Sequence, residues 1–231
     1  MLGIQLTLSG TYSFFRIPYN SLLMDSYPFP PRTTAIGLLA AAMGYDEKKF
    51  FDLLEKVKYG VIIESPGQIA SELASIFKEK KVPIYPITKN FYYRPVYKLF
   101  YASEDENIIY EAERGLKDPA FVLTLGDSEN LFYPQTPNYS RVFDNVKPVS
   151  SNSVECVLPS DIYAKFANGH FSKIRDDFYP PREINISVGF SGEGKKRRSV
   201  LGRVTYYSGI RIQLKDPLQV YDFDGNGVYL F

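Results

Sequence analysis

Hydrophobic and polar residues alternate at the start of the chain. Ile4, Leu6 and Leu8 are separated by single polar residues. A period of two is typical of a β-strand that buries one face. The pattern therefore predicts that the chain opens with a strand.

A proline-rich segment, Tyr27 to Gly44, predicts a loop that turns into a helix. Its three prolines lack backbone donors and disfavour helix in the residues before them. Thr33 or Thr34 is expected to cap the helix, and Gly44 is expected to end it in a left-handed conformation. Gly37 costs roughly 1 kcal/mol relative to Ala inside a helix, which indicates the close approach of a backbone or a ligand.

Two further helices are expected. Asp46 is placed to cap one of them, in which apolar residues recur at helical spacing up to Val57. The other is predicted from Ile69 to Phe77, where the spacing is again helical and lysines follow at the negative end of the helix dipole.

The rest of the chain is predicted to be mostly strands, because runs rich in Tyr and Val are separated by Gly, Pro and Asn turns. The runs cover residues 61–64, 91–101, 120–125, 184–190, 203–213 and 218–230. Helices near the start followed by many strands predict an α+β fold. A loop rich in Pro and Ser at residues 134–153 marks the boundary between two parts.

Composition limits the classes of function. The 231 residues are 45% hydrophobic and 23% charged, as in an ordinary folded protein. A net charge of +1 excludes a nucleic-acid binder that acts through overall charge, so a basic surface must be local. The single cysteine, Cys156, excludes an internal disulfide and fits the cytoplasm. Neither a signal peptide nor a membrane span is expected.

Two early segments, GTYSFFRIPY and SYPFPPRTTAIGLLAAAMG, carry a family resemblance. Over roughly the first 45 residues the chain resembles the Cas-five family of CRISPR-associated RAMP proteins, subunits of type I Cascade complexes. A weaker similarity lies in LTLGDSE, from Leu123 to Glu129. The matching positions are Gly10, Phe15, Arg16, Pro18, Pro28, Pro30, Pro31, Arg32, Thr33, Gly37, Leu38 and Leu39.

The resemblance implies a ferredoxin-like, RRM-related domain with a protruding β-hairpin over residues 1–140. A smaller, mostly β part is expected to pack against it over residues 141–231. The implied function is non-catalytic: the chain holds the 5′ handle of a guide RNA and bridges the backbone and large subunits of Cascade in antiviral defence. Target DNA is then an indirect partner, and no cofactor or metal is expected.

Candidate RNA contacts lie near the start of the chain. Arg16 and Arg32 flank the proline-rich loop and the helix start, where guanidinium and backbone donors can hold a phosphate. Tyr19 and Thr33 belong to the same candidate surface. The alternative for Arg16 is an ion pair with a carboxylate on a neighbouring strand.

A second candidate is KNFYYRPVYKLFY, from Lys89 to Tyr101, where cations alternate with aromatic rings. Strand alternation would place Tyr92, Arg94 and Lys98 on one face, where rings and cations can hold single-stranded RNA. The alternative is a half-buried strand with an ordinary polar face. Its proline favours an edge or hairpin position.

The most basic run lies beside three glycines in GFSGEGKKRRS, residues 189–199. Glycines ease the approach of a phosphate, so this loop is a third candidate RNA site. The alternative is an exposed hairpin tip. Its candidate residues are Lys195, Lys196, Arg197 and Arg198.

Two other segments, around His170 and at DFDGNG, raise the question of catalysis or metal binding. His170 is the only histidine, which excludes enzymes that need paired histidines. A metal-independent endoribonuclease that processes precursor RNA stays an alternative function, as does a purely structural bridge between subunits. DFDGNG, from Asp222 to Gly227, resembles half of a calcium loop, but its Asp-Gly and Asn-Gly pairs predict a hairpin turn.

Overall fold

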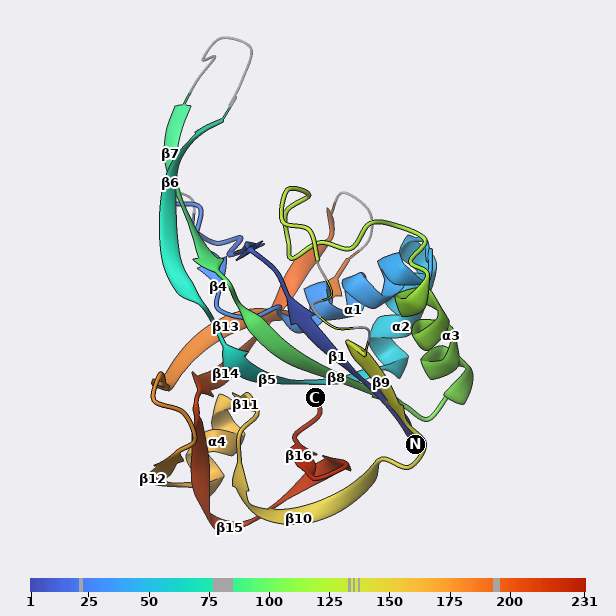
Figure 1. Cartoon of the computed structure of the whole chain (residues 1–231), viewed down its shortest axis with the longest axis vertical. Coiled ribbons are helices and arrows are strands. Elements are labelled where there is room, and N and C mark those ends of the chain that lie inside the picture. The colour runs from blue at the N-terminus through green and yellow to red at the C-terminus, as the bar shows by residue number, and fades with distance from the viewer. Residues whose placement is uncertain (21–22, 77–84, 133, 135, 137, 193–195) are drawn as a thin grey trace.

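The computed structural model describes all residues except 21–22, 77–84, 133, 135, 137 and 193–195. Helices and strands are mixed along the chain, which confirms the predicted α+β class. A seven-stranded sheet separates two hydrophobic cores, one beneath three helices and one beside a four-stranded sheet (Figure 1). Whether the chain divides at residue 140 stays a prediction.

The seven-stranded sheet begins with the predicted first strand. Its order is β13, β14, β5, β8, β1 and β9, with the short β11 also beside β14. Only the β14–β5 pairing is parallel. The strands are β1 (Leu2–Ser9), β5 (Lys58–Ser65), β8 (Val96–Ser103), β9 (Ser140–Phe143), β11 (Leu158–Pro159), β13 (Tyr179–Ser191) and β14 (Arg198–Ser208).

Three helices cover one face of this sheet: α1 (Arg32–Ala42), α2 (Glu47–Lys56) and α3 (Glu106–Lys117). Alternation along β8 sends Leu99 and Tyr101 toward the helices and Phe100 toward the opposite core. Asp46 caps α2 as predicted, since its side chain accepts a hydrogen bond from the Lys49 backbone N–H. Helix α3 is not predicted from the sequence.

A four-stranded sheet packs on the other face of the main sheet. It consists of β10 (Lys147–Val154), β15 (Ile210–Phe223), β12 (Ala167–Lys173) and β16 (Asn226–Val228), with α4 (Ser160–Phe166) beside it. Phe223 contacts Phe100 and Phe143 across the interface. Asp224 and Gly225, both with positive φ, turn the chain between β15 and β16, which confirms the predicted hairpin turn.

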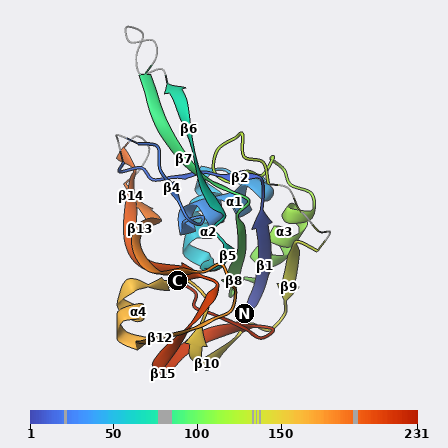
Figure 2. The ribbon, with the colours of Figure 1, turned by 60° about the vertical axis from the view of Figure 1, so that its left-hand side comes forward.

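A long antiparallel pair, β6 (Gln68–Ile76) and β7 (Tyr85–Tyr93), extends beyond the rest of the molecule (Figures 1 and 2). β2 (Tyr12–Ser13) pairs with the base of β7, and β3 (Phe15–Arg16) pairs with β4 (Ser26–Tyr27). The helix predicted from Ile69 is therefore wrong over its described residues. Ile69 and Leu73 are an even number of residues apart, so they share a strand face as well as a helix face, and they are 64% and 75% exposed.

The single strand predicted over residues 91–101 is also wrong. β7 ends at Tyr93, Arg94 adopts a left-handed φ of 55°, and β8 begins at Val96. Tyr92 and Lys98 therefore lie in different sheets. The strand predicted over residues 120–125 is reduced to one bridge between Thr124 and Leu131.

Helix α1 differs from its prediction at its start. Pro31 occupies the N-cap position, and no side chain caps the helix there. Gly44 ends the segment with a φ of 68°, as predicted. A Cβ on Gly37 would meet only Phe50, at an ordinary 3.8 Å, so the expected close approach is wrong.

None of the described helices is both long and apolar enough to cross a membrane.

Candidate nucleic-acid interface

Arg32 holds four backbone carbonyls together. Its Nε donates to Phe231 O at 3.2 Å and Nη1 to Val188 O at 2.9 Å. Its Nη2 donates to Leu54 O at 2.6 Å and Val57 O at 3.0 Å. Burial lowers the pKa of the guanidinium. Most of its donors are used inside the fold, and its expected contact with a phosphate stays a prediction.

Three of the residues predicted to contact RNA donate hydrogen bonds to backbone carbonyls of β13. Tyr19 Oη donates to Asn185 O at 3.2 Å, and Thr33 Oγ1 donates to Ser187 O at 3.4 Å. Arg32 donates to Val188 O, so the three side chains together bind carbonyls within residues 185–188 of this strand. Thr33 is buried and its hydroxyl bonds within the fold, and its contact with RNA stays a prediction. The Tyr19 ring is 53% exposed, and its contact with RNA stays a prediction.

Lys89 lies in a cluster of carboxylates. Its Nζ is 2.8 Å from Asp127, 3.6 Å from Glu72 and 4.0 Å from Glu129, and it lies over the Phe14 ring. Burial disfavours its charge, but the hydrogen bond to Asp127 and the nearby carboxylates outweigh burial and raise the pKa of Lys89. Lys89 is only 8% exposed and its ammonium is held inside the fold, so its expected contact with RNA stays a prediction.

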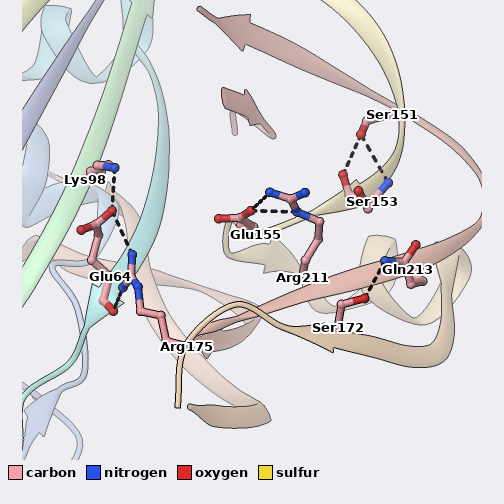
Figure 3. A network of polar contacts seen from close by, with 9 residues as sticks. All are labelled: Glu64, Lys98, Ser151, Ser153, Glu155, Ser172, Arg175, Arg211 and Gln213. Atoms are coloured by element: carbon pink, nitrogen blue, oxygen red, sulfur yellow. Dashed lines mark hydrogen bonds and ion pairs between the residues drawn. The ribbon is translucent and has the colours of Figure 1, made fainter. Parts of the chain in front are cut away.

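Lys98 takes part in a second ionic cluster (Figure 3). Its Nζ is 2.6 Å from a Glu64 oxygen, and Arg175 Nη2 is 3.2 Å from the same atom. Burial opposes the Glu64 charge, but both cations outweigh it and lower the pKa of Glu64. Arg175 also donates to the Glu64 backbone carbonyl. This pairing corrects the placement of Lys98 beside Tyr92 and Arg94.

Exposed rings and a cation meet at the base of the β6–β7 pair. Tyr12 packs edge-on against Phe91 at 5.1 Å between ring centroids and lies 5.5 Å from Tyr93. The Arg94 guanidinium lies 5.1 Å from the Tyr93 centroid. The Arg94 backbone N–H donates to Thr11 O at 2.8 Å, which fixes the turn. We call Tyr12, Phe91, Tyr93 and Arg94 the Arg94 cluster.

Tyr92 points to the opposite face of β7 and belongs to a second group. Arg182 and Tyr206 are directly opposite each other on β13 and β14, and Tyr206 packs against Phe29. Burial raises the pKa of Tyr92, with Tyr206 and Tyr179 as neighbouring groups. Arg182 is exposed beside these rings. Sequence reasoning missed Arg182, which follows two prolines inside a strand, and Tyr12, which lies in the GTYSFFR segment.

The remaining predicted cations lie on the surface. Arg16, at the end of β3, is exposed, and the described ion pairs include neither Arg16 nor Arg94. Lys196 and Arg198 are exposed where the chain enters β14. Arg197 pairs with Glu47 and lies 4.9 Å from the Phe190 centroid. Lys195 lies outside the described residues.

The described part of the chain offers little support for metal binding or for catalysis by His170. No cluster of His, Cys, Asp and Glu there has the arrangement of a metal site. His170 is exposed on β12, and its backbone N–H donates to Asn168 Oδ1 at 2.9 Å. It follows Gly169, whose φ is 82°, in the part of β12 where the pairing with β15 shifts register.

Comparisons with known proteins gave a match to one family model and to solved structures of the same fold. Residues 3–137 match the model described as CRISPR-associated protein (Cas_Cas5). A chain of a "CRISPR RNA-guided surveillance complex" shares the fold with a TM-score of 0.60 and 16% identity, over 93% of this chain and 91% of that one. A "CRISPR protein from Archaeoglobus fulgidus" matches with a TM-score of 0.51 and 14% identity, over 99% and 98%. Comparison with curated proteins gave no match. With more than half of its length matched by the family model, the chain belongs to the CRISPR-associated Cas5 family.

Proposed function

We propose that the chain is a non-catalytic, guide-RNA-binding subunit of a type I CRISPR surveillance complex in the cytoplasm. It holds the repeat-derived 5′ handle of the guide RNA and bridges the backbone and large subunits, so that target DNA is an indirect partner. Family membership supports this role, as does the fold shared with a chain of a CRISPR RNA-guided surveillance complex.

The Arg94 cluster is the observation that carries the proposal. It combines three partly exposed rings with an exposed guanidinium that has no carboxylate partner among the described residues. Rings stack on unpaired bases and cations neutralise phosphates, and this pairing of groups is how proteins hold single-stranded RNA. Arg16 on β3 and Arg182 on β13 are further exposed cations outside the Arg94 cluster.

The topology supports the ferredoxin-like core that we infer for the family domain. When α2, the short strands β2–β4 and the inserted pair β6–β7 are set aside, β1, α1, β5, β8, α3 and β9 occur in the order strand, helix, strand, strand, helix, strand. These strands lie in the sheet order β5–β8–β1–β9, as expected for a split β-α-β arrangement. We infer that β6–β7, inserted between β5 and β8, is the protruding hairpin of the family.

A binding experiment tests the RNA role. Arg94→Ala should weaken binding of a labelled 5′-handle RNA about tenfold, because a stacking or phosphate contact is worth roughly 1 to 3 kcal/mol. Fluorescence anisotropy at several salt concentrations gives the affinity and its salt dependence. The control is Lys117→Ala on α3, which removes a cation paired with Glu113. Equal affinities for both variants and wild type would contradict the proposal.

The absence of catalysis is part of the proposal and needs its own test. Neither ring nitrogen of His170 has a hydrogen-bond partner among the described residues, whereas a general base needs an oriented ring. Incubation of purified protein with precursor repeat RNA in EDTA should leave the RNA intact. Specific cleavage that is lost in His170→Ala would instead establish the endoribonuclease alternative.

A further inference from the structure

The outer edge of β6 carries unpaired backbone groups. This strand of nine residues pairs only with β7 in the described part of the chain. No described group outside the β6–β7 hairpin forms a hydrogen bond with the backbone of residues 68–76. In Figures 1 and 2, no other element lies beside the half of β6 nearer the hairpin tip, on the side away from β7. Such a row of donors and acceptors is completed by another extended polypeptide strand.

Two common protections of a strand edge, proline and lysine, are absent from β6. Its sequence is QIASELASI. Its single charged residue, Glu72, lies 3.6 Å from Lys89 Nζ on the face of the hairpin where Lys89 is buried. The backbone edge of β6 is therefore open to pairing.

Exposed apolar side chains lie on the other face of β6. Ile69 and Leu73 are 64% and 75% exposed and share this face, because they are four residues apart in a strand. Ser71 lies between them, and its hydroxyl donates to Asn90 Oδ1 on β7 at 2.6 Å. A partner strand must match this apolar, polar, apolar pattern. A nucleic-acid backbone lacks the alternating N–H and C=O groups that would complete the ladder.

The strand complements a second copy of itself. Antiparallel pairing about a two-fold axis at Ser71 places Ile69 of each copy opposite Leu73 of the other. It places Glu72 opposite Ala70, so no like charges face each other. An axis one residue further along would instead oppose the two Glu72 side chains. With the axis at Ser71, the exposed apolar side chains of both copies form one continuous strip.

We propose that the chain forms a two-fold dimer in which the β6 edges of two copies pair antiparallel about Ser71. The two hairpins then share one continuous sheet. The far edge of β7 is already occupied, because Met24 N donates to Thr88 O and Asn90 N donates to Met24 O. Association therefore ends at two copies. The dimer needs neither RNA nor another subunit, so it does not depend on the proposed function.

Sedimentation equilibrium of the chain without RNA tests the dimer. The apparent mass should rise from 26.4 kDa toward twice that value as the concentration increases to about 0.5 mM. Leu73→Glu should weaken association about tenfold, because two cross-strand pairs lose their apolar contact. Val122→Glu is the control, since Val122 is 76% exposed and lies outside the hairpin, and it should associate like wild type. A wild-type chain that stays monomeric would overturn the proposal and leave the edge to a strand of another protein.

Paired charges test the register. Ile69→Lys combined with Leu73→Glu places a cation opposite a carboxylate at both symmetric pairs, and association should return to within about threefold of wild type. Ile69→Glu combined with Leu73→Glu places like charges there and should associate more weakly than Leu73→Glu alone. Both residues are exposed, so the thermal unfolding midpoints should match wild type. Equal association of the two double variants would overturn the pairing about Ser71.

Discussion

At the scale of single residues, the hydrogen-bond partners of an arginine decide what it can do. Arg32 and Arg94 both come from segments that predict RNA binding. Arg32 bonds carbonyls up to 199 residues away in the chain, whereas Arg94 bonds through its backbone and leaves its guanidinium over Tyr93. Local sequence cannot reveal such distant partners, so the internal hydrogen bonds of Arg32 and Thr33 could not be predicted.

Removal of the Arg32 guanidinium should destabilise the fold. Arg32→Ala leaves four carbonyls without this donor and should lower the free energy of unfolding by about 2 to 4 kcal/mol in urea denaturation. Arg32→Lys should recover little, because one ammonium cannot reproduce the planar fork. Arg94→Ala is the matched control and should unfold like wild type. Wild-type stability in Arg32→Ala, together with lost RNA affinity, would show that Arg32 acts on RNA rather than on the fold.

Gly126 in the LTLGDSE segment should tolerate no side chain. Its φ is +106°, and a Cβ would lie 1.9 Å from the Phe14 carbonyl oxygen. Gly126→Ala should therefore cost about 3 kcal/mol or more in thermal or urea unfolding. Gly169→Ala is the control, because Gly169 also has a positive φ but nothing within 4 Å of the added Cβ. Its cost should be about 1 to 2 kcal/mol; equal costs for the two variants would argue against the steric clash.

At the scale of elements, the sequence predicts what local rules determine. β1, α2 and the β15–β16 turn follow from alternation, an Asp cap and an Asp-Gly pair. Strand β6 was predicted as a helix, because apolar residues four apart share one face in a helix and in a strand alike. The turn at Arg94 was not predicted, because a non-glycine residue adopts the left-handed conformation there. Helix α3 has its apolar residues at helical spacing, so better use of the same rule would find it.

The ion pairs of Lys89 with Glu72, Asp127 and Glu129 should stabilise the contact between the base of the β6–β7 hairpin and the loop that carries Gly126. Lys89→Met keeps an apolar stem but leaves Asp127 and Glu72 without their cation. We expect faster amide hydrogen exchange in β6, β7 and residues 123–131, with exchange in α2 unchanged. Lys117→Met, which breaks an exposed pair on α3, is the control. Unchanged exchange at the hairpin base would show that backbone pairing alone holds it.

At the scale of the whole molecule, Glu64 joins the main sheet to the second layer. The cations on it come from β8 and from the segment after β12 (Figure 3). Its lowered pKa means that its contribution is complete above the unfolded-state pKa and is lost as the pH falls through the folded-state value. Glu64→Gln should therefore lower the free energy of unfolding at pH 7 by roughly 1.5 to 3 kcal/mol.

The difference between Glu64→Gln and wild type should shrink on acidification, because wild-type Glu64 is then protonated as well. Urea denaturation at pH 7 and at about pH 3 measures both differences. Glu155→Gln, which removes the partner of Arg211 within the second layer, is a comparison at another ion pair. A Glu64→Gln difference that is independent of pH would show that charge is not what Glu64 contributes.

The side-chain donors along β13 have a consequence for how the molecule can assemble. A 13-residue strand at the rim of a sheet is a template on which another chain can add a strand, and such growth leads to aggregation. Tyr19, Thr33 and Arg32 already occupy carbonyls that an added strand would need. A neighbour that meets β13 at residues 185–188 therefore finds side chains in place of a free backbone edge, which keeps this edge of the main sheet from becoming the seed of a fibre.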